Sequence, residues 1–346
     1  MSDLSFIKEI INVKAQKNNM QNNKRACLGQ VVPLSTPYVV VIEPSGYCNL
    51  KCVFCPINDE KYSNALKKSF MDKEIFLKII NDLKQFTERI KIIRLIGNGE
   101  PLLNSNIIEM VKIIKDSNVA EMVEITTNGT LLNENISLGL IDAGLDILKI
   151  SVEALTKIEF KKIAKYEIDI EKYRKNIEFF YNNKKQCQVY IKINNLAIKN
   201  KEEEKVFFNY YGDYADNIFI ENISPVWPEF DDGLKIEYES TRFGETVKKR
   251  NVCSHIFKSI MICADGEILP CCADWQRKLL LGNIKNDSIL DIWKGYKLES
   301  LQKAFLNNKR MKIVPCNECL YNEYCDPDIL DGYEKEILNR MEKKLL

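Results

Sequence analysis

The stretch YVVVIEPSGYCNLKCVFC, residues 38–55, combines a strand signal with a metal-binding signal. Residues 38–43 are mostly β-branched and do not alternate with polar residues, which predicts a strand buried on both faces. Cys48, Cys52 and Cys55 follow, with three and then two residues between them. Thiolates are the usual ligands of iron–sulfur clusters. Three ligands on a cluster of four irons would leave one iron open to a substrate or cofactor.

Outward from this stretch, strand-like and helix-like segments alternate. The predicted strands are 38–43, 91–96, 122–127, 147–153, 189–194 and 217–223, and the predicted helices between them are 71–88, 104–116, 133–143, 155–184 and 201–211. Strands that alternate with helices imply a parallel sheet, and right-handed crossovers curl such a sheet. The predicted fold class is therefore α/β, a partial (β/α)6 TIM-like barrel.

Composition narrows the class of protein. The chain has 346 residues, a formal net charge of +1, twelve cysteines and one histidine, His255. The near-zero charge argues against nucleic acid as a partner. Residues 1–30 lack the apolar core of a signal peptide, and no apolar run is long enough to span a membrane, so we expect a cytoplasmic protein. Clustered cysteines in a reducing compartment indicate metal sites rather than disulfides.

The loop cysteines closely resemble those of the radical S-adenosylmethionine (SAM) superfamily. The resemblance implies a [4Fe–4S] cluster on Cys48, Cys52 and Cys55, whose open iron binds the amino and carboxylate groups of S-adenosyl-L-methionine, and it places Phe54 near the adenine. The alternative is a structural zinc knuckle, which needs a fourth ligand nearby. No Cys or His occurs between Cys55 and Cys187.

The ends of the later strands extend this resemblance. Residues 97–101, Gly-Asn-Gly-Glu-Pro, resemble the Gly-Gly-Glu motif that holds the methionine amino group in the family, although Asn98 departs from the pattern. The arginine that the family often has after the fourth strand has no clear equivalent here, and Lys165 is the cation considered in its place. The polar residues and glycines at these strand ends are explained equally well by turn formation or strand capping as by contact with a ligand. The cofactor contacts that the resemblance implies are Gly97, Gly99, Glu100, Pro101, Thr127, Asn128, Ser151, Glu153, Lys192, Asn194 and Asn195.

The remaining cysteines crowd the last hundred residues. Asp265-Gly266 predicts a hairpin of 258–262 and 267–271, followed by helices at 289–307 and 330–344. Twelve residues separate Cys253 from Gly266, and four separate Gly266 from Cys271. This spacing, with the later cysteines, resembles the SPASM/twitch subgroup and implies one auxiliary [4Fe–4S] cluster. The expected ligands are Cys253, Cys271, Cys316 and Cys319, with Cys325, Cys272 and Cys263 as substitutes. A structural zinc ribbon is the alternative, and Cys27 and Cys187 are predicted to be buried.

Four segments are expected: a lead-in at 1–35, a radical SAM partial barrel at 36–225, a small β-hairpin and helix auxiliary-cluster domain at 226–330, and a C-terminal helix at 331–346. Trp227, Glu229, Asp231 and Asp232 fit either a substrate loop or an exposed linker. The resemblance implies reductive SAM cleavage and hydrogen abstraction, with electrons from a flavodoxin or ferredoxin.

The outcome of the reaction stays open at this point. It is either oxidation through the auxiliary cluster or epimerisation with Cys272 or Cys325 as hydrogen donor. A small molecule of the carbohydrate type is the first substrate hypothesis, and a peptide or protein is the second. A non-catalytic iron–sulfur or zinc scaffold is the alternative from a different class.

Overall fold

The structure is a computed structural model that describes residues 15–17, 26–58, 68–228, 230, 233–234 and 238–343. Most of the predicted lead-in at 1–35 lies outside the described residues, and so do Glu229, Asp231 and Asp232. No helix within the described ranges is both long enough and apolar enough to cross a bilayer.

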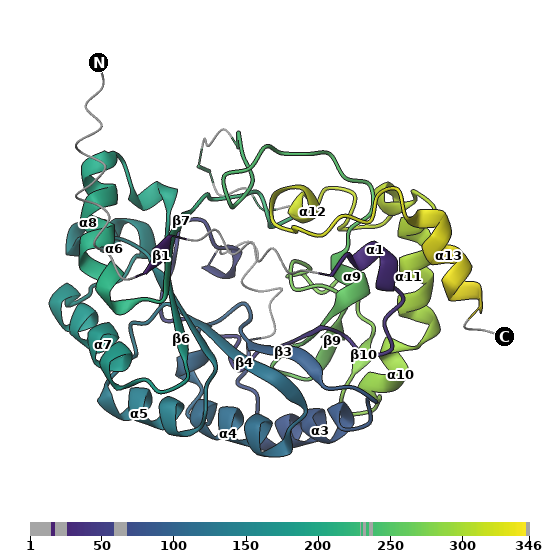
Figure 1. Ribbon diagram of the computed structural model, residues 1–346, viewed down its shortest axis with the longest axis horizontal. Coiled ribbons are helices and arrows are strands. Elements are labelled where there is room, and N and C mark those ends of the chain that lie inside the picture. Colours follow the sequence, from purple (N-terminus) through teal and green to yellow (C-terminus); the bar gives the residue numbers. More distant parts are fainter. Residues whose placement is uncertain are drawn as a thin grey trace.

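Six parallel strands form the centre of the molecule, as predicted. They pair in chain order, so each strand lies beside the next one in the sequence, and the sheet curves around an interior (Figure 1). This arrangement is a partial TIM barrel. The strands are β2 (Val39–Ile42), β3 (Ile90–Leu95), β4 (Ala120–Thr127), β5 (Ile147–Val152), β6 (Gln188–Asn194) and β7 (Asn217–Glu221).

Helices cover the convex side of this sheet (Figure 1). Their apolar faces and the outward side chains of the strands form one core, in which Phe76, Ile79 and Phe160 are buried. Asp72 caps the first of these helices by accepting a hydrogen bond from the Ile75 N–H at 2.7 Å, as predicted. The helices are α3 (Lys73–Leu83), α4 (Ile107–Ser117), α5 (Glu134–Asp142), α6 (Lys157–Ala164), α7 (Ile170–Asn183) and α8 (Lys201–Tyr211).

The C-terminal segment continues the same sheet. β8 (Ser259–Ile262) pairs in parallel with β2, and β9 (Glu267–Leu269) pairs antiparallel with β8. The predicted hairpin is present, with Gly266 at a positive φ of 91° in the turn. β10 (Gly282–Asn283) follows β9, and β1 (Gln16–Lys17) lies at the far edge beside β7. The auxiliary segment is therefore joined to the barrel by hydrogen bonds along β2.

The predicted helix at 289–307 is wrong in one respect, because two helices occupy it: α10 (Ile289–Trp293) and α11 (Tyr296–Leu306). Gly295 lies between them in an extended conformation, and a Cβ there would come within 2.5 Å of the Asp291 carbonyl. The other helices are α1 (Leu28–Val31), α9 (His255–Lys258), α12 (Tyr321–Tyr324) and α13 (Glu334–Lys343), with 3₁₀ turns at Pro56–Asn58, Pro101–Leu103, Asn195–Ala197, Gly212–Tyr214 and Arg310–Lys312.

Candidate active site

The three-cysteine loop leaves the carboxyl end of β2 and is fixed from two sides. The N–H groups of Lys51 and Val53 donate to the carbonyls of Ala164 and Ile163 near the end of α6, at 2.8 and 3.0 Å. The Asn128 side chain, at the end of β4, donates to the side chain of Asn49 at 3.0 Å. These contacts hold the loop over the open end of the barrel.

The three loop thiols are half-buried and lie close enough to act on one another electrostatically. Burial raises the pKa of Cys48 to about 11 and that of Cys55 to about 12, and it raises the pKa of Cys52 further. The charged groups that act on them are the other thiols and the carboxylates Glu100 and Glu153, which also disfavour thiolates. Metal ligands must be thiolates. A bound cationic centre would supply the missing compensation, so this donor set fits an iron–sulfur cluster.

Glu100 braces the loop against two strand ends. Its Oε1 accepts hydrogen bonds from Thr127 Oγ1 at 2.6 Å and from the Leu102 N–H at 3.0 Å, while Oε2 accepts from the Asn128 N–H at 2.8 Å. Its own N–H donates to the Tyr47 carbonyl at 2.8 Å. Both carboxylate oxygens therefore have protein partners, and the side chain connects β3, β4 and the cysteine loop.

The glycines of the Gly-Asn-Gly-Glu-Pro segment make room for this loop. A Cβ on Gly99 would lie 2.3 Å from the carbonyl oxygens of Ser45 and Tyr47, and one on Gly97 would lie 2.4 Å from the Glu43 side chain. Real Cβ atoms do not approach other atoms this closely. Close packing against the loop thus explains both glycines without any ligand.

A cavity of about 420 Å³, here called the rim cavity, opens beside the cysteine loop. Burial raises the pKa of Glu153, which lines it, to about 7, while Lys192 opposes this shift. The Asn194 amide lies 3.5 Å from a Glu153 oxygen. The predicted cofactor contacts that line the rim cavity are Phe54, Ser151, Glu153, Lys192 and Asn194.

The other predicted contacts do not line the rim cavity. Asn195 accepts a hydrogen bond from the Ile223 N–H at 2.9 Å and fixes the chain after β7. Gly97 borders a deeper cavity described below. The remaining contacts belong to the braced strand ends: Gly99, Glu100, Pro101, Thr127 and Asn128.

The deeper cavity, here called the lumen cavity, has a volume of about 280 Å³ and lies within the barrel. Five successive strands each direct one charged side chain into its lining, and Arg242 adds a sixth charge. Lys192, Glu221, Val226, Trp227 and Arg242 line both cavities, so the two are neighbours. The strand residues are Arg94, Glu124, Lys149, Lys192 and Glu221.

Apart from Lys192, these charged residues were not predicted from the sequence. Barrel interiors are normally filled with branched apolar side chains, and a single charge inside an apolar strand is easily taken for an outward-facing residue. The signal was nevertheless present, because Arg94 and Lys149 each stand between two apolar residues in the segments 91–96 and 147–152.

The second group of cysteines also converges. Burial raises the pKa of Cys253, and the thiols of Cys319 and Cys316 raise it further. Cys271 in turn interacts with Cys253 and Cys319. The Arg310 guanidinium donates to the carbonyls of Cys316 and Cys319, at 2.7 and 3.0 Å, and holds that turn. Four thiols from three segments thus surround one place, and their donor set also fits an iron–sulfur cluster.

The cysteines outside the two groups differ in burial and in their contacts. Cys325 is buried, interacts with Arg242 and Ser224, and has a pKa raised to about 11 by burial. Cys263 and Cys187 are buried. The prediction for Cys27 is wrong, because its thiol is exposed and contacts the Tyr333 hydroxyl at 3.4 Å.

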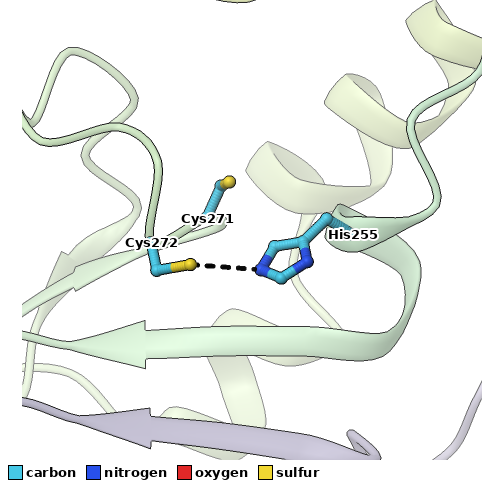
Figure 2. A group of neighbouring side chains, drawn as sticks. All are labelled: His255, Cys271 and Cys272. Carbon is cyan, nitrogen blue, oxygen red and sulfur yellow. Dashed lines mark hydrogen bonds between the residues drawn. The ribbon is translucent and has the colours of Figure 1, made fainter. Parts of the chain in front are cut away.

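His255 and Cys272 form a pair that faces the lumen cavity. Figure 2 shows the Cys272 side chain directed at the imidazole, with its Sγ 3.6 Å from Nε2, while the neighbouring Cys271 points in a different direction. One ligand atom from each of these three residues fits within 4.8 Å of the others. The sequence did not reveal this pair, because the β8–β9 hairpin brings its two members together.

Two family models match this chain. Residues 42–207 match the Radical SAM superfamily, and residues 253–320 match an iron-sulfur cluster-binding domain called SPASM. The tungsten-containing aldehyde ferredoxin oxidoreductase cofactor-modifying protein of Pyrococcus furiosus is 23% identical over 334 residues, which cover 82% of this chain and 88% of that protein. A probable GTP 3′,8-cyclase of Methanococcus maripaludis is 35% identical over 132 residues, which cover 38% of this chain and 41% of the cyclase.

Solved structures share the fold. SuiB of Streptococcus suis, bound to its precursor peptide SuiA, superposes with a TM-score of 0.62 and 17% identity over 94% of this chain and 84% of SuiB. BtrN in complex with AdoMet and 2-DOIA gives a TM-score of 0.54 and 19% identity over 85% of this chain and 94% of BtrN. The AdoMet-bound anSMEcpe gives a TM-score of 0.57 and 17% identity over 89% of this chain and 92% of anSMEcpe.

The chain belongs to the radical SAM superfamily and carries a SPASM-type iron–sulfur domain. Its cofactors are accordingly a [4Fe–4S] cluster, SAM and an auxiliary cluster.

Proposed function

We propose that this enzyme cleaves SAM at the loop cysteines and takes a hydrogen atom from a small molecule bound in the lumen cavity. The observation that carries this proposal is the convergence of three half-buried thiols beside the rim cavity, which Cys55 and Phe54 line. The lumen cavity adjoins the rim cavity and, at about 280 Å³, accommodates a small molecule or one side chain of a peptide.

The residues of the rim cavity have distinct roles in this proposal. Cys48, Cys52 and Cys55 hold the cluster through their thiolates and leave one iron free of protein ligands. When bound, the cluster and SAM together supply a 5′-deoxyadenosyl radical, which can remove hydrogen from an unactivated carbon. Lys192 supplies a cation for a carboxylate, and Phe54 supplies an apolar surface for the adenine.

Ser151, Glu153 and Asn194 complete the cofactor site. They lie along the same cavity wall at the ends of β5 and β6 and offer hydroxyl, carboxyl and amide groups to the ribose and amino groups. Glu100, Thr127 and Asn128 act indirectly, because their hydrogen bonds to one another and to the cysteine loop position that loop.

Cys253, Cys271, Cys316 and Cys319 hold one auxiliary [4Fe–4S] cluster in this proposal. The residue after Cys271, Cys272, lines the lumen cavity. A cluster held there would lie beside the substrate site and would supply an acceptor for the second electron, so that the substrate radical, on losing this electron and a proton, would give a net oxidised product. The first electron comes from a separate flavodoxin or ferredoxin. None of the twelve cysteines, all of which lie in the described part of the chain, forms a disulfide, which is consistent with our placing the enzyme in the reducing cytoplasm.

The direct test is formation of 5′-deoxyadenosine by anaerobically reconstituted, reduced protein that is supplied with SAM. We expect the product from the wild type and a loss of at least about a hundredfold in Cys55→Ala, because that variant lacks one of three cluster ligands. Cys27→Ala is the matched control, because its thiol is exposed and contacts the Tyr333 hydroxyl near the C-terminal helix. Absence of product from the wild type would favour a non-catalytic scaffold.

Epimerisation is a second candidate, because the Cys272 thiol lines the lumen cavity beside His255. Cys325, buried against Arg242, is the other candidate hydrogen donor. A reaction in D₂O separates the two outcomes. A product that carries one solvent deuterium at an inverted carbon favours epimerisation, while a product two hydrogens lighter than the substrate, without solvent deuterium, favours oxidation.

The class of substrate is tested by deuterium transfer from candidate substrates into 5′-deoxyadenosine. The Pyrococcus relative is described as a cofactor-modifying protein, and BtrN was crystallised with 2-DOIA, which favours a small molecule. SuiB was crystallised with a precursor peptide, so a peptide substrate is the second candidate. Label from a peptide but from no small molecule would reverse our preference.

A further inference from the structure

The charged residues of the lumen cavity form two similar groups. In the first, Glu124 lies between Arg94 and Lys149. In the second, Glu221 lies between Lys192 and Arg242. Each group contains two cations and one carboxylate. Burying charged groups is costly unless they are paired, so a lining with more cations than carboxylates requires an explanation.

In each group the lysine lies closer to the carboxylate than the arginine does. Lys149 Nζ lies 2.8 Å from Glu124, whereas Arg94 Nε approaches the same residue only to 3.4 Å. Lys192 donates a hydrogen bond to Glu221, whereas Arg242 Nε lies 3.5 Å from the same carboxylate. Neither arginine Nε has a hydrogen-bond partner among the described residues. The carboxylates therefore leave both guanidinium groups only partly paired.

Both arginines are open to the cavity. The side chains of Arg94 and Arg242 are 36% and 32% accessible, although both line the lumen inside the barrel. Burial by itself would raise the pKa of Glu124 and Glu221, but the neighbouring cations have the larger effect and lower both pKa values. Both side chains are therefore carboxylates. Even with Cys272 as a thiolate, the lining has more positive than negative charge.

We infer that the lumen cavity binds a substrate through an oxyanion, a carboxylate or phosphate, held between Arg94 and Arg242. Guanidinium groups match the geometry of both oxyanions and bind them through paired hydrogen bonds. An anionic group here neutralises the surplus of cations and leaves the rest of the substrate beside Cys272 and the rim cavity. This inference rests on the proposed function, whose substrate site it defines.

Isothermal titration calorimetry on the anaerobic holoenzyme tests the inference with three probes: inorganic phosphate, succinate, and erythritol as a neutral molecule with the same number of carbons as succinate. We expect saturable binding of phosphate or succinate and none of erythritol. Arg94→Gln should weaken anion binding about ten- to hundredfold, since it removes charge-assisted hydrogen bonds. Arg94→Lys should recover part of the loss.

Arg89→Gln is the matched control, because Arg89 immediately precedes β3 but contacts the Asn118 side chain on the exposed surface. It should bind both anions like the wild type. Iron content and circular dichroism verify folding of each variant, and Arg242→Gln provides an independent second variant with the same expected loss. Binding of only one of the two anions identifies the oxyanion.

Three results would overturn the inference: no saturable binding of either anion, equal binding by Arg94→Gln and the wild type, or competition between the anion and SAM. Competition would assign the arginines to the carboxylate of SAM instead of a substrate. Failure of the proposed function has a different signature, which is absence of 5′-deoxyadenosine from the wild type whatever the calorimetry gives.

Discussion

Glu100 and Glu153 are both buried carboxylates near strand ends, but their surroundings differ. Glu100 accepts three hydrogen bonds from protein donors. Glu153 lines the rim cavity, and its one side-chain hydrogen-bond contact with any described residue is to the Asn194 amide at 3.5 Å. The first residue is therefore built into the scaffold, while the second is available to a ligand.

Glu100→Gln is expected to destabilise the protein in the absence of any cofactor. The amide would direct N–H groups at donors that now face a carboxylate oxygen, and unsatisfied buried polar groups cost about 1–3 kcal/mol each. Thermal unfolding of the metal-free chain measures this loss. Glu109→Gln is the control, because Glu109 makes an exposed pair with Lys73. Unchanged stability of Glu100→Gln would instead favour a role limited to binding SAM.

Glu153 should make the stability of the metal-free chain depend on pH. Burial raises its pKa from 4.5 to about 7. The folded chain then holds a proton that the unfolded chain has released, so stability falls as the pH rises from about 4.5 to 7. The stability of Glu153→Gln relative to the wild type should increase by about 3 kcal/mol across this window. Chemical denaturation between pH 4.5 and 8 tests this, and parallel curves for the two chains would contradict it.

At the scale of elements, the sequence predicted local structure better than contacts between elements. The β-branched run at 38–43 and the Asp265-Gly266 turn identified a strand and a hairpin correctly. Neither pattern predicts that β8 pairs with β2, because the pairing and register of strands that are distant in the sequence depend on the whole fold. The break at Gly295 was missed for a related reason, since the apolar periodicity continues on both sides of it.

The β2–β8 pairing predicts that the two cluster sites depend on each other. Ile260→Pro removes a backbone N–H from β8, which lies between β2 and β9, and should destabilise the chain by about 3 kcal/mol or more. We expect both the loop iron and the auxiliary iron to decrease. Ile260→Val keeps the backbone hydrogen bond and is the control. Selective loss of the auxiliary iron would show that the two sites fold independently.

At the scale of the whole molecule, two groups of thiols flank a charged interior. The sequence revealed both groups through cysteine spacing, and three strand-end residues, Ser151, Glu153 and Asn194, do line the rim cavity. It did not reveal the charged lumen or the Cys272–His255 pair. Those features arise where side chains from separate strands and a hairpin meet inside the barrel, so they depend on tertiary structure.

The most direct test of the central claim is electron paramagnetic resonance of the reduced Cys316→Ala/Cys319→Ala protein, which should retain only the cluster on the three-cysteine loop. Spectra are recorded with and without SAM. The claim that three loop thiols leave one iron open predicts a [4Fe–4S]⁺ signal whose g values change when SAM is added. A signal that SAM leaves unchanged, or a loop that holds zinc without sulfide, would contradict it.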